Sequence, residues 1–63
     1  MTWEVDYACI YRPVWYSDSE HGDPQRAMLR AQQVYQSTGR SVRVTDWQGT
    51  VVYAIQGQQH PGC

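Results

Sequence analysis

His21 is the residue of this sequence best suited to proton transfer, because three acidic residues surround it. Asp18, Glu20 and Asp23 lie within three positions of it along the chain. An imidazole titrates near neutral pH, and nearby carboxylates can orient it or stabilise its charged form. The same stretch also suits a solvated loop in which Asp23 caps a following helix. A catalytic site needs a concave pocket that excludes water, and so small a domain offers little concavity, so we do not expect an enzyme.

Two thiols and two imidazoles are the candidate metal ligands of the chain. His60 and Cys63 are close together near the end of the sequence, and Cys9 and His21 would complete a Cys₂His₂ set. Zinc accepts these ligand types, but their spacing matches no usual zinc pattern. We therefore expect no metal and no cofactor, with a small zinc-binding protein as an alternative. In a cytoplasmic protein we expect reduced thiols, with Cys9 as a small buried hydrophobe and a Cys9–Cys63 disulfide as the alternative.

All five basic residues are arginines, and they stand against six acidic residues, so the formal net charge is −1. Non-specific binding to nucleic acid needs clustered cations that displace counterions, and a balanced chain gives no general case for it. A local basic patch of Arg26, Arg30 and Arg40 beside Arg43 remains an alternative. It would make the protein a nucleic-acid-binding accessory protein.

The N-terminal stretch 2–12 alternates in the manner of a β-strand. Its odd-numbered residues, which are mostly aromatic, would share one face, and Pro13 would end the strand. Residues 14–22 are polar at their end and are expected to form a connection. The odd face consists of Trp3, Val5, Tyr7, Cys9 and Tyr11.

One helix is predicted from Pro24 to about Ser37. Asp23 is a favourable N-cap, proline suits the first helical position, and Gly39 can end the helix in a left-handed conformation. The helical spacing puts small and apolar residues on one side, with Leu29 pointing away. This side consists of Ala27, Ala31, Val34, Tyr35 and Thr38, with Met28 at its margin.

A β-hairpin is predicted over 41–56, with two β-branched runs, 42–45 and 50–55, around the turn Asp46-Trp47-Gln48-Gly49. A type I turn with Gly49 in a bulge would place Val44 opposite Val52 and Val42 opposite Ala54. Those four would face the helix. The other face would then carry Arg43, Thr45, Val51, Tyr53 and Ile55.

These elements predict an α+β fold with the order β-α-β-β. We expect one domain over 1–56, a flexible polar tail over 57–63, and a three-stranded antiparallel sheet with the last strand central and one helix on one face. Parallel pairing of the first two strands is the alternative. A chain of 63 residues is near the size limit for independent folding. The sequence shows no signal peptide and no membrane-spanning run, so we expect a cytoplasmic protein.

One helix can cover only one face of a sheet, so the other face is expected to be a contact surface. A contiguous apolar surface on a small protein usually binds something, and Trp, Tyr and Arg are frequent in protein interfaces. The expected partner is a larger protein or a second copy in a homodimer, not a membrane. Trp47 at the hairpin tip either packs on its own sheet or enters a partner. The expected partner-binding residues are Trp3, Tyr7, Tyr11, Arg43, Trp47, Val51, Tyr53 and Ile55.

In size and predicted architecture the whole chain resembles small inhibitor proteins of phages and mobile elements, including anti-CRISPR proteins. No sequence motif carries the resemblance. It implies a non-enzymatic viral protein that binds and inhibits a host protein complex.

Overall fold

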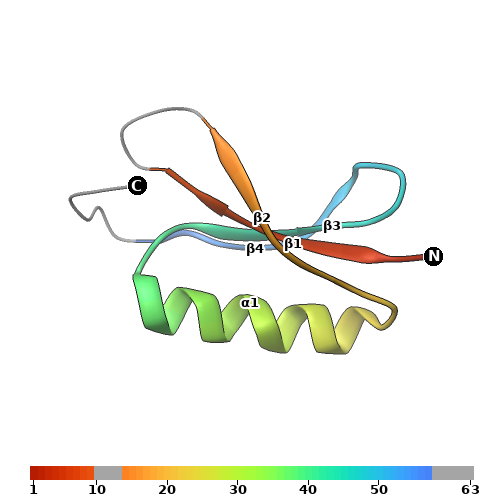
Figure 1. Ribbon diagram of the computed structural model, residues 1–63, viewed down its shortest axis with the longest axis horizontal. Coiled ribbons are helices and arrows are strands. Elements are labelled where there is room, and N and C mark those ends of the chain that lie inside the picture. The colour runs from red at the N-terminus through yellow and green to blue at the C-terminus, as the bar shows by residue number, and fades with distance from the viewer. Residues whose placement is uncertain (10–13, 58–63) are drawn as a thin grey trace.

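The fold is a four-stranded sheet with one helix packed on one face (Figure 1). The computed structural model describes residues 1–9 and 14–57. The elements are β1 (Trp3–Ala8), β2 (Trp15–His21), α1 (Pro24–Thr38), β3 (Val42–Thr45) and β4 (Val51–Ile55). All neighbouring strands are antiparallel, in the order β2-β1-β3-β4. The α+β class is confirmed, but the prediction of three strands with the last one central is wrong.

The strand that the sequence did not reveal is β2. All seven of its residues lie within 14–22, which was expected to be a connection, and most of the strand is polar. It lies at the edge of the sheet and pairs with β1 alone among the described strands. An edge strand can leave much of its surface in water, so it needs no alternating apolar residues. This is why the hydrophobic pattern failed to predict it.

The position of β1 follows from this additional strand. β2 and β3 are both antiparallel to β1 and therefore run parallel to each other on either side of it, connected by α1. Val5 of β1 lies opposite Val44 of β3 and opposite Ser19 of β2. The N-terminal strand is thus an interior strand, and β4 is the second edge.

The ends of α1 are capped as the sequence predicts. Asp23 has an extended backbone, and its Oδ1 accepts a 2.8 Å hydrogen bond from the Gln25 amide. At the other end Gly39 adopts φ of 70°, and its amide donates to the Tyr35 carbonyl at 2.7 Å. Both bonds satisfy backbone groups that a helix end leaves without partners. The helix ends at Thr38, one residue beyond the predicted Ser37.

The core lies between α1 and the two interior strands. Val5, Val42 and Val44 are fully buried, and the small side chains of α1 let its backbone approach them closely. Larger aromatic and aliphatic side chains surround this centre and are partly buried. The core consists of Val5, Ala27, Ala31, Val34, Val42 and Val44, with Trp3, Tyr7, Tyr35, Tyr53 and Ile55 packed against it.

The turn between β3 and β4 has the predicted form, but the register beyond it does not. Gly49 has φ of 84°, its amide bonds to the Asp46 carbonyl, and Thr45 pairs with Val51. The register then shifts by one residue, so Val44 lies opposite Tyr53 instead of the predicted Val52. Such a shift moves the following side chains to the other face.

The register shift exchanges small residues for large ones on the helix side. Ile55 lies opposite Val42 on the helix side of the sheet. Ala54 lies opposite Arg43 on the open face, which is the face turned away from α1. Both placements are the reverse of the prediction. Each methylene group that is buried contributes ~0.8 kcal/mol to stability. Burying Ile55 instead of Ala54 on the helix side therefore favours the observed register by up to about 2 kcal/mol. The burial of apolar area therefore explains the bulge that the turn sequence alone does not reveal.

Gly57 is fixed to the start of β3, although the sequence predicts a flexible tail from this residue onward. Its amide donates to the Ser41 hydroxyl at 2.9 Å. A Cβ atom at this position would overlap the backbone of Gly39, Arg40 and Ser41. Only glycine therefore fits here. The rest of the predicted tail, 58–63, lies outside the described residues.

Cys9 is buried, as predicted, but it is not a reduced thiol. It is 4% exposed and disulfide-bonded. The only other cysteine of the chain, Cys63, lies outside the described residues. The expectation of a reduced Cys9 is thus wrong.

Candidate functional site

The open face of the sheet carries an ion pair beneath an aromatic ring. Arg43 Nε donates to Asp6 Oδ2 across the β1–β3 pair at 3.4 Å, and the guanidinium lies 4.1 Å from the ring centroid of Trp15 on β2. Asp6 is only 4% exposed, whereas Trp15 is 38% exposed. A buried carboxylate thus holds the guanidinium, and the guanidinium holds the indole in position at the surface.

Two glutamates on the same face increase its negative charge. Glu4 of β1 lies directly opposite Glu20 of β2, and Asp6 follows two residues along β1. The hydrogen bond that Glu4 shares with Asp6 raises the pKa of Glu4, and the negative charges of Asp6 and Glu20 raise it further. Carboxylates held this close favour a bound cation or a shared proton.

A cavity of about 340 Å³ opens at this end of the sheet, beside the β3–β4 turn. Asp46 fixes the turn, because its Oδ1 accepts from the amides of Gln48 and Thr50, both at 2.9 Å. The Trp47 ring lies 5.3 Å from that of Trp3, at an angle of 89°. This edge-to-face contact positions a half-exposed indole beside carboxylates. The cavity is lined by Thr2, Glu4, Glu20, Thr45, Asp46, Trp47 and Gly49.

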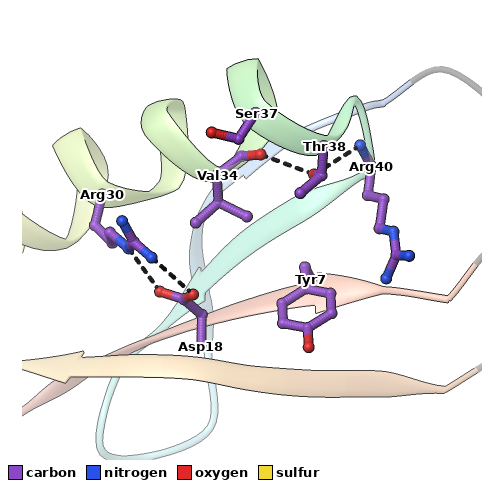
Figure 2. Close-up of a pocket in the computed structure, with 7 residues that line it drawn as sticks. All are labelled: Tyr7, Asp18, Arg30, Val34, Ser37, Thr38 and Arg40. Atoms are coloured by element: carbon purple, nitrogen blue, oxygen red, sulfur yellow. Dashed lines mark hydrogen bonds and ion pairs between the residues drawn. The ribbon is translucent and has the colours of Figure 1, made fainter. Parts of the chain in front are cut away.

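A second cavity, of about 430 Å³, lies on the helix side between α1 and the β1–β2 pair (Figure 2). Figure 2 shows the Asp18 carboxylate pointing from β2 toward the helix and Arg30 reaching down to it, while the Tyr7 ring lies over β1 with its hydroxyl directed away from the helix. Arg30 donates twice to Asp18, at 2.8 and 3.1 Å, and this hydrogen bonding lowers the pKa of the Asp18 carboxyl. Arg40 lies over the Tyr7 ring at 5.6 Å. The charged side chains of this cavity therefore contact other residues of its lining.

The structure divides the predicted contact residues between the two faces. Arg43 and Val51 lie on the open face as predicted, and Trp47 is exposed at the turn while contacting Trp3. The placement of Trp3, Tyr7, Tyr53 and Ile55 on an open aromatic face is wrong. Trp3, Tyr7, Tyr53 and Ile55 pack against the core on the helix side, and Tyr11 lies outside the described residues.

Sequence reasoning missed Trp15 and Glu20 as members of the open face. Their positions depend on the strand order, because each meets its neighbours only when β2 is paired with β1. The one signal was the pair of adjacent aromatics at 15–16, which lie on opposite faces. Tyr16 contacts Tyr7 with ring centroids 5.6 Å apart, while Trp15 contacts Arg43.

The predicted basic patch is not continuous. Arg30 is paired with Asp18 on the helix side, and Arg43 is paired with Asp6 on the opposite face. Arg26 belongs to α1, and Arg40 contacts the Tyr7 ring. The arginines are therefore divided between two faces and do not line a single groove for a phosphate backbone.

The acid–base candidates form a short chain of hydrogen bonds. Ser19 Oγ donates to Asp18 Oδ2 at 2.8 Å and shares a second hydrogen bond of 2.8 Å with His21 Nε2. In a catalytic triad the carboxylate orients the histidine, whereas here Asp18 binds the serine and Arg30. Asp23 is used as the helix cap. The predicted helix cap is confirmed for Asp23, whereas Asp18, Glu20 and His21 belong to strand β2 and not to the predicted solvated loop.

The candidate metal ligands are not brought together in the part of the chain that the structure describes. Among residues 1–9 and 14–57 no group of three or more His, Cys, Asp or Glu side chains is arranged to hold a metal ion. His60 and Cys63 lie outside these residues, and Cys9 is in a disulfide. A disulfide sulfur is not the thiolate that zinc requires.

Comparison with protein-family models, curated proteins and solved structures finds no match for this chain. No helix in the described residues is long and apolar enough to cross a membrane. The site therefore has to be interpreted from its own geometry.

Proposed function

We propose that this protein is a non-enzymatic protein-binding module that uses the open face of its sheet. The observation that carries the proposal is the stack of Trp15 on Arg43, with Asp6 beneath it. Trp and Arg are the side chains that most often dominate the binding energy of protein interfaces. Because both are already held in place, binding loses less side-chain entropy than it would with mobile residues.

The partner suited to this face carries a basic side chain. Glu4 and Glu20 face each other beside the cavity at the turn, where Trp47 forms part of the wall. A lysine or arginine from the partner would neutralise the two carboxylates and lie against the indole. The partner's cation would replace the unfavourable contact between like charges in the free protein.

The resemblance to small phage and mobile-element inhibitors now rests on size alone, because the strand order differs from the predicted one. An inhibitor of a larger host complex is one form that this binding function can take. A contact of standard size, about 800 Å² per partner, would occupy about a fifth of the surface of 4285 Å² that the protein exposes.

Affinity capture with matched variants tests the proposal. The immobilised wild-type protein, Trp15→Ala, the Glu4→Gln/Glu20→Gln double variant and Gln33→Ala are compared in extract of the native cell. Gln33 is exposed on α1 and serves as the control. We expect one protein that wild type and the control retain equally and that Trp15→Ala retains at least about tenfold less, which corresponds to ~1.4 kcal/mol. Equal retention by all four proteins, or retention of nucleic acid only, would refute the proposal.

A further inference from the structure

The two edges of the sheet differ in charge. β2 carries Asp18 and Glu20, whereas residues 50–57, which include all of β4, contain no Asp, Glu, Lys or Arg. Val51 and Val52 are 48% and 43% exposed at this edge, and Ala54 is exposed as well. Natural proteins usually protect an open edge strand with charges or proline, because its free backbone groups can pair with another strand. β4 has neither.

The flank of α1 beside β4 is uncharged as well. Gln32 Nε2 donates to the Tyr53 hydroxyl at 3.3 Å, which identifies the flank that lies over β4. Helical spacing places Gln25, Met28 and Gln36 on this flank. Arg30 lies on the opposite flank, where it binds Asp18 of β2. The neutral edge therefore continues from the sheet onto the helix.

We propose that β4 is the interface of a homodimer, in which it pairs antiparallel with β4 of a second copy. A two-fold axis at Ala54 places Ala54 opposite Ala54 of the second copy and Tyr53 opposite Ile55 of the second copy. These pairs join residues on the same face, since Tyr53 and Ile55 both lie on the helix side and Ala54 lies on the open face. The dimer has one continuous sheet with both helices on the same side.

The lack of charged residues on this edge suits pairing with a second copy. In a two-fold interface each residue near the axis meets its own copy, so a charged residue there meets a like charge. An edge without charges avoids this repulsion. The bulge of β4 lies near its start, before Tyr53, and leaves Tyr53–Ile55 regular enough to pair.

The predicted dimer is weak, because β4 has only five residues. Interfaces that bury less than about 1,200 Å² in total are usually transient. We therefore expect a reversible equilibrium with a dissociation constant on the order of 10 µM. The open face with Trp15 and Arg43 stays accessible in this dimer, so the interface is separate from the proposed partner site.

Sedimentation over about 1 µM to 1 mM protein tests the dimer with charge-swapped variants. Wild type is expected to change from the mass of one chain, 7.3 kDa, to twice that mass as the concentration rises. Ala54→Glu and Ala54→Lys place like charges together at the axis, so each alone should stay monomeric. Their equimolar mixture should form dimers again, because opposite charges then meet. Ser17→Lys at the exposed β2 edge is the matched control and should behave as wild type.

Amide hydrogen exchange provides a second measurement that needs no variant. In wild type, protection of the β4 amides should increase with protein concentration, while that of the β2 amides should not. A protein that stays monomeric throughout, or a dimer that persists equally in both Ala54 variants, would overturn the proposal. A monomer whose β4 pairs only with a foreign peptide would overturn it too. Trp15→Ala should leave the dimer mass unchanged, which separates this result from the test of the partner site.

Discussion

The guanidinium of Arg43 lies between the carboxylate of Asp6 and the indole of Trp15, 3.4 Å from the carboxylate oxygen and 4.1 Å from the ring centroid. The three residues come from three adjacent strands. One contact therefore joins the buried centre of the open face to its exposed edge. It exists only because β1 lies between β2 and β3.

Arg43→Ala should lower the free energy of unfolding by about 2 kcal/mol, because it leaves the Asp6 carboxylate buried without its cation. The additional change Asp6→Asn should recover part of this loss, since no charge is then buried. Urea denaturation of both variants measures the difference. If the single and double variants unfold at the same urea concentration, Asp6 is not stabilised by Arg43.

Glu4→Gln should stabilise the protein at neutral pH, by on the order of 0.5 kcal/mol for a partly exposed group. The folded state raises the pKa of Glu4 above its usual 4.5, because the protonated form donates to Asp6 and the charged form faces Asp6 and Glu20. The stability from Glu4 is therefore present below pH 4.5 and is lost as the pH rises through the folded pKa. A glutamine keeps a donor at every pH.

Thermal unfolding of wild type and Glu4→Gln at about pH 4 and pH 7 measures this effect. The melting temperatures should differ more at pH 7 than at pH 4. Thr2→Ala, beside the same cavity, is the control and should show no such pH dependence. An advantage of Glu4→Gln that is larger at the lower pH would contradict the proposed cause.

Arg30→Gln should make the free energy of unfolding less sensitive to a fall in pH. Hydrogen bonding to Arg30 lowers the pKa of Asp18 below its usual 3.8. The stability from this pair is therefore complete above pH 3.8 and is lost as the pH falls through the folded pKa. Unfolding of wild type and Arg30→Gln between about pH 7 and pH 2 should show curves that converge at the acid end. Arg26→Gln, also exposed on α1, is the control and should follow wild type.

Gly57→Ala should destabilise the protein by about 1–3 kcal/mol, because the added methyl group overlaps the backbone at 39–41. Gly22→Ala is the matched control, since nothing lies within 4 Å of a Cβ atom there. Chemical denaturation of the two variants compares a crowded glycine with an open one. Equal stability of both would show that the chain after β4 does not pack against Ser41.

The sequence predicts the parts of the fold that local interactions determine. The Asp23 cap, the Gly39 end of the helix, the Gly49 turn and the burial of Val42 and Val44 are all confirmed. Each depends on residues close together in the chain or on a simple periodic pattern.

The open face was harder to predict because it depends on pairing between distant residues. A polar edge strand lacks the pattern that would reveal β2, and a bulge in β4 leaves no mark in the turn sequence. Together these two features move Tyr53 and Ile55 to the helix side and bring Trp15 onto the open face. The site is therefore set by register, which the sequence alone did not reveal.

The interior position of β1 has a consequence for the order of events during synthesis. β1 leaves the ribosome before the other described strands, and β2 can pair with it soon afterwards. Its other edge has to wait for β3, so Val5 cannot meet Val44 until the helix between them has also been made. Contacts between distant residues form late because closing a long loop is entropically unfavourable. The pairing of β1 is thus completed late, although β1 is made before the other described strands. During this interval the edge of β1 that will face β3 is exposed to pairing with other nascent chains.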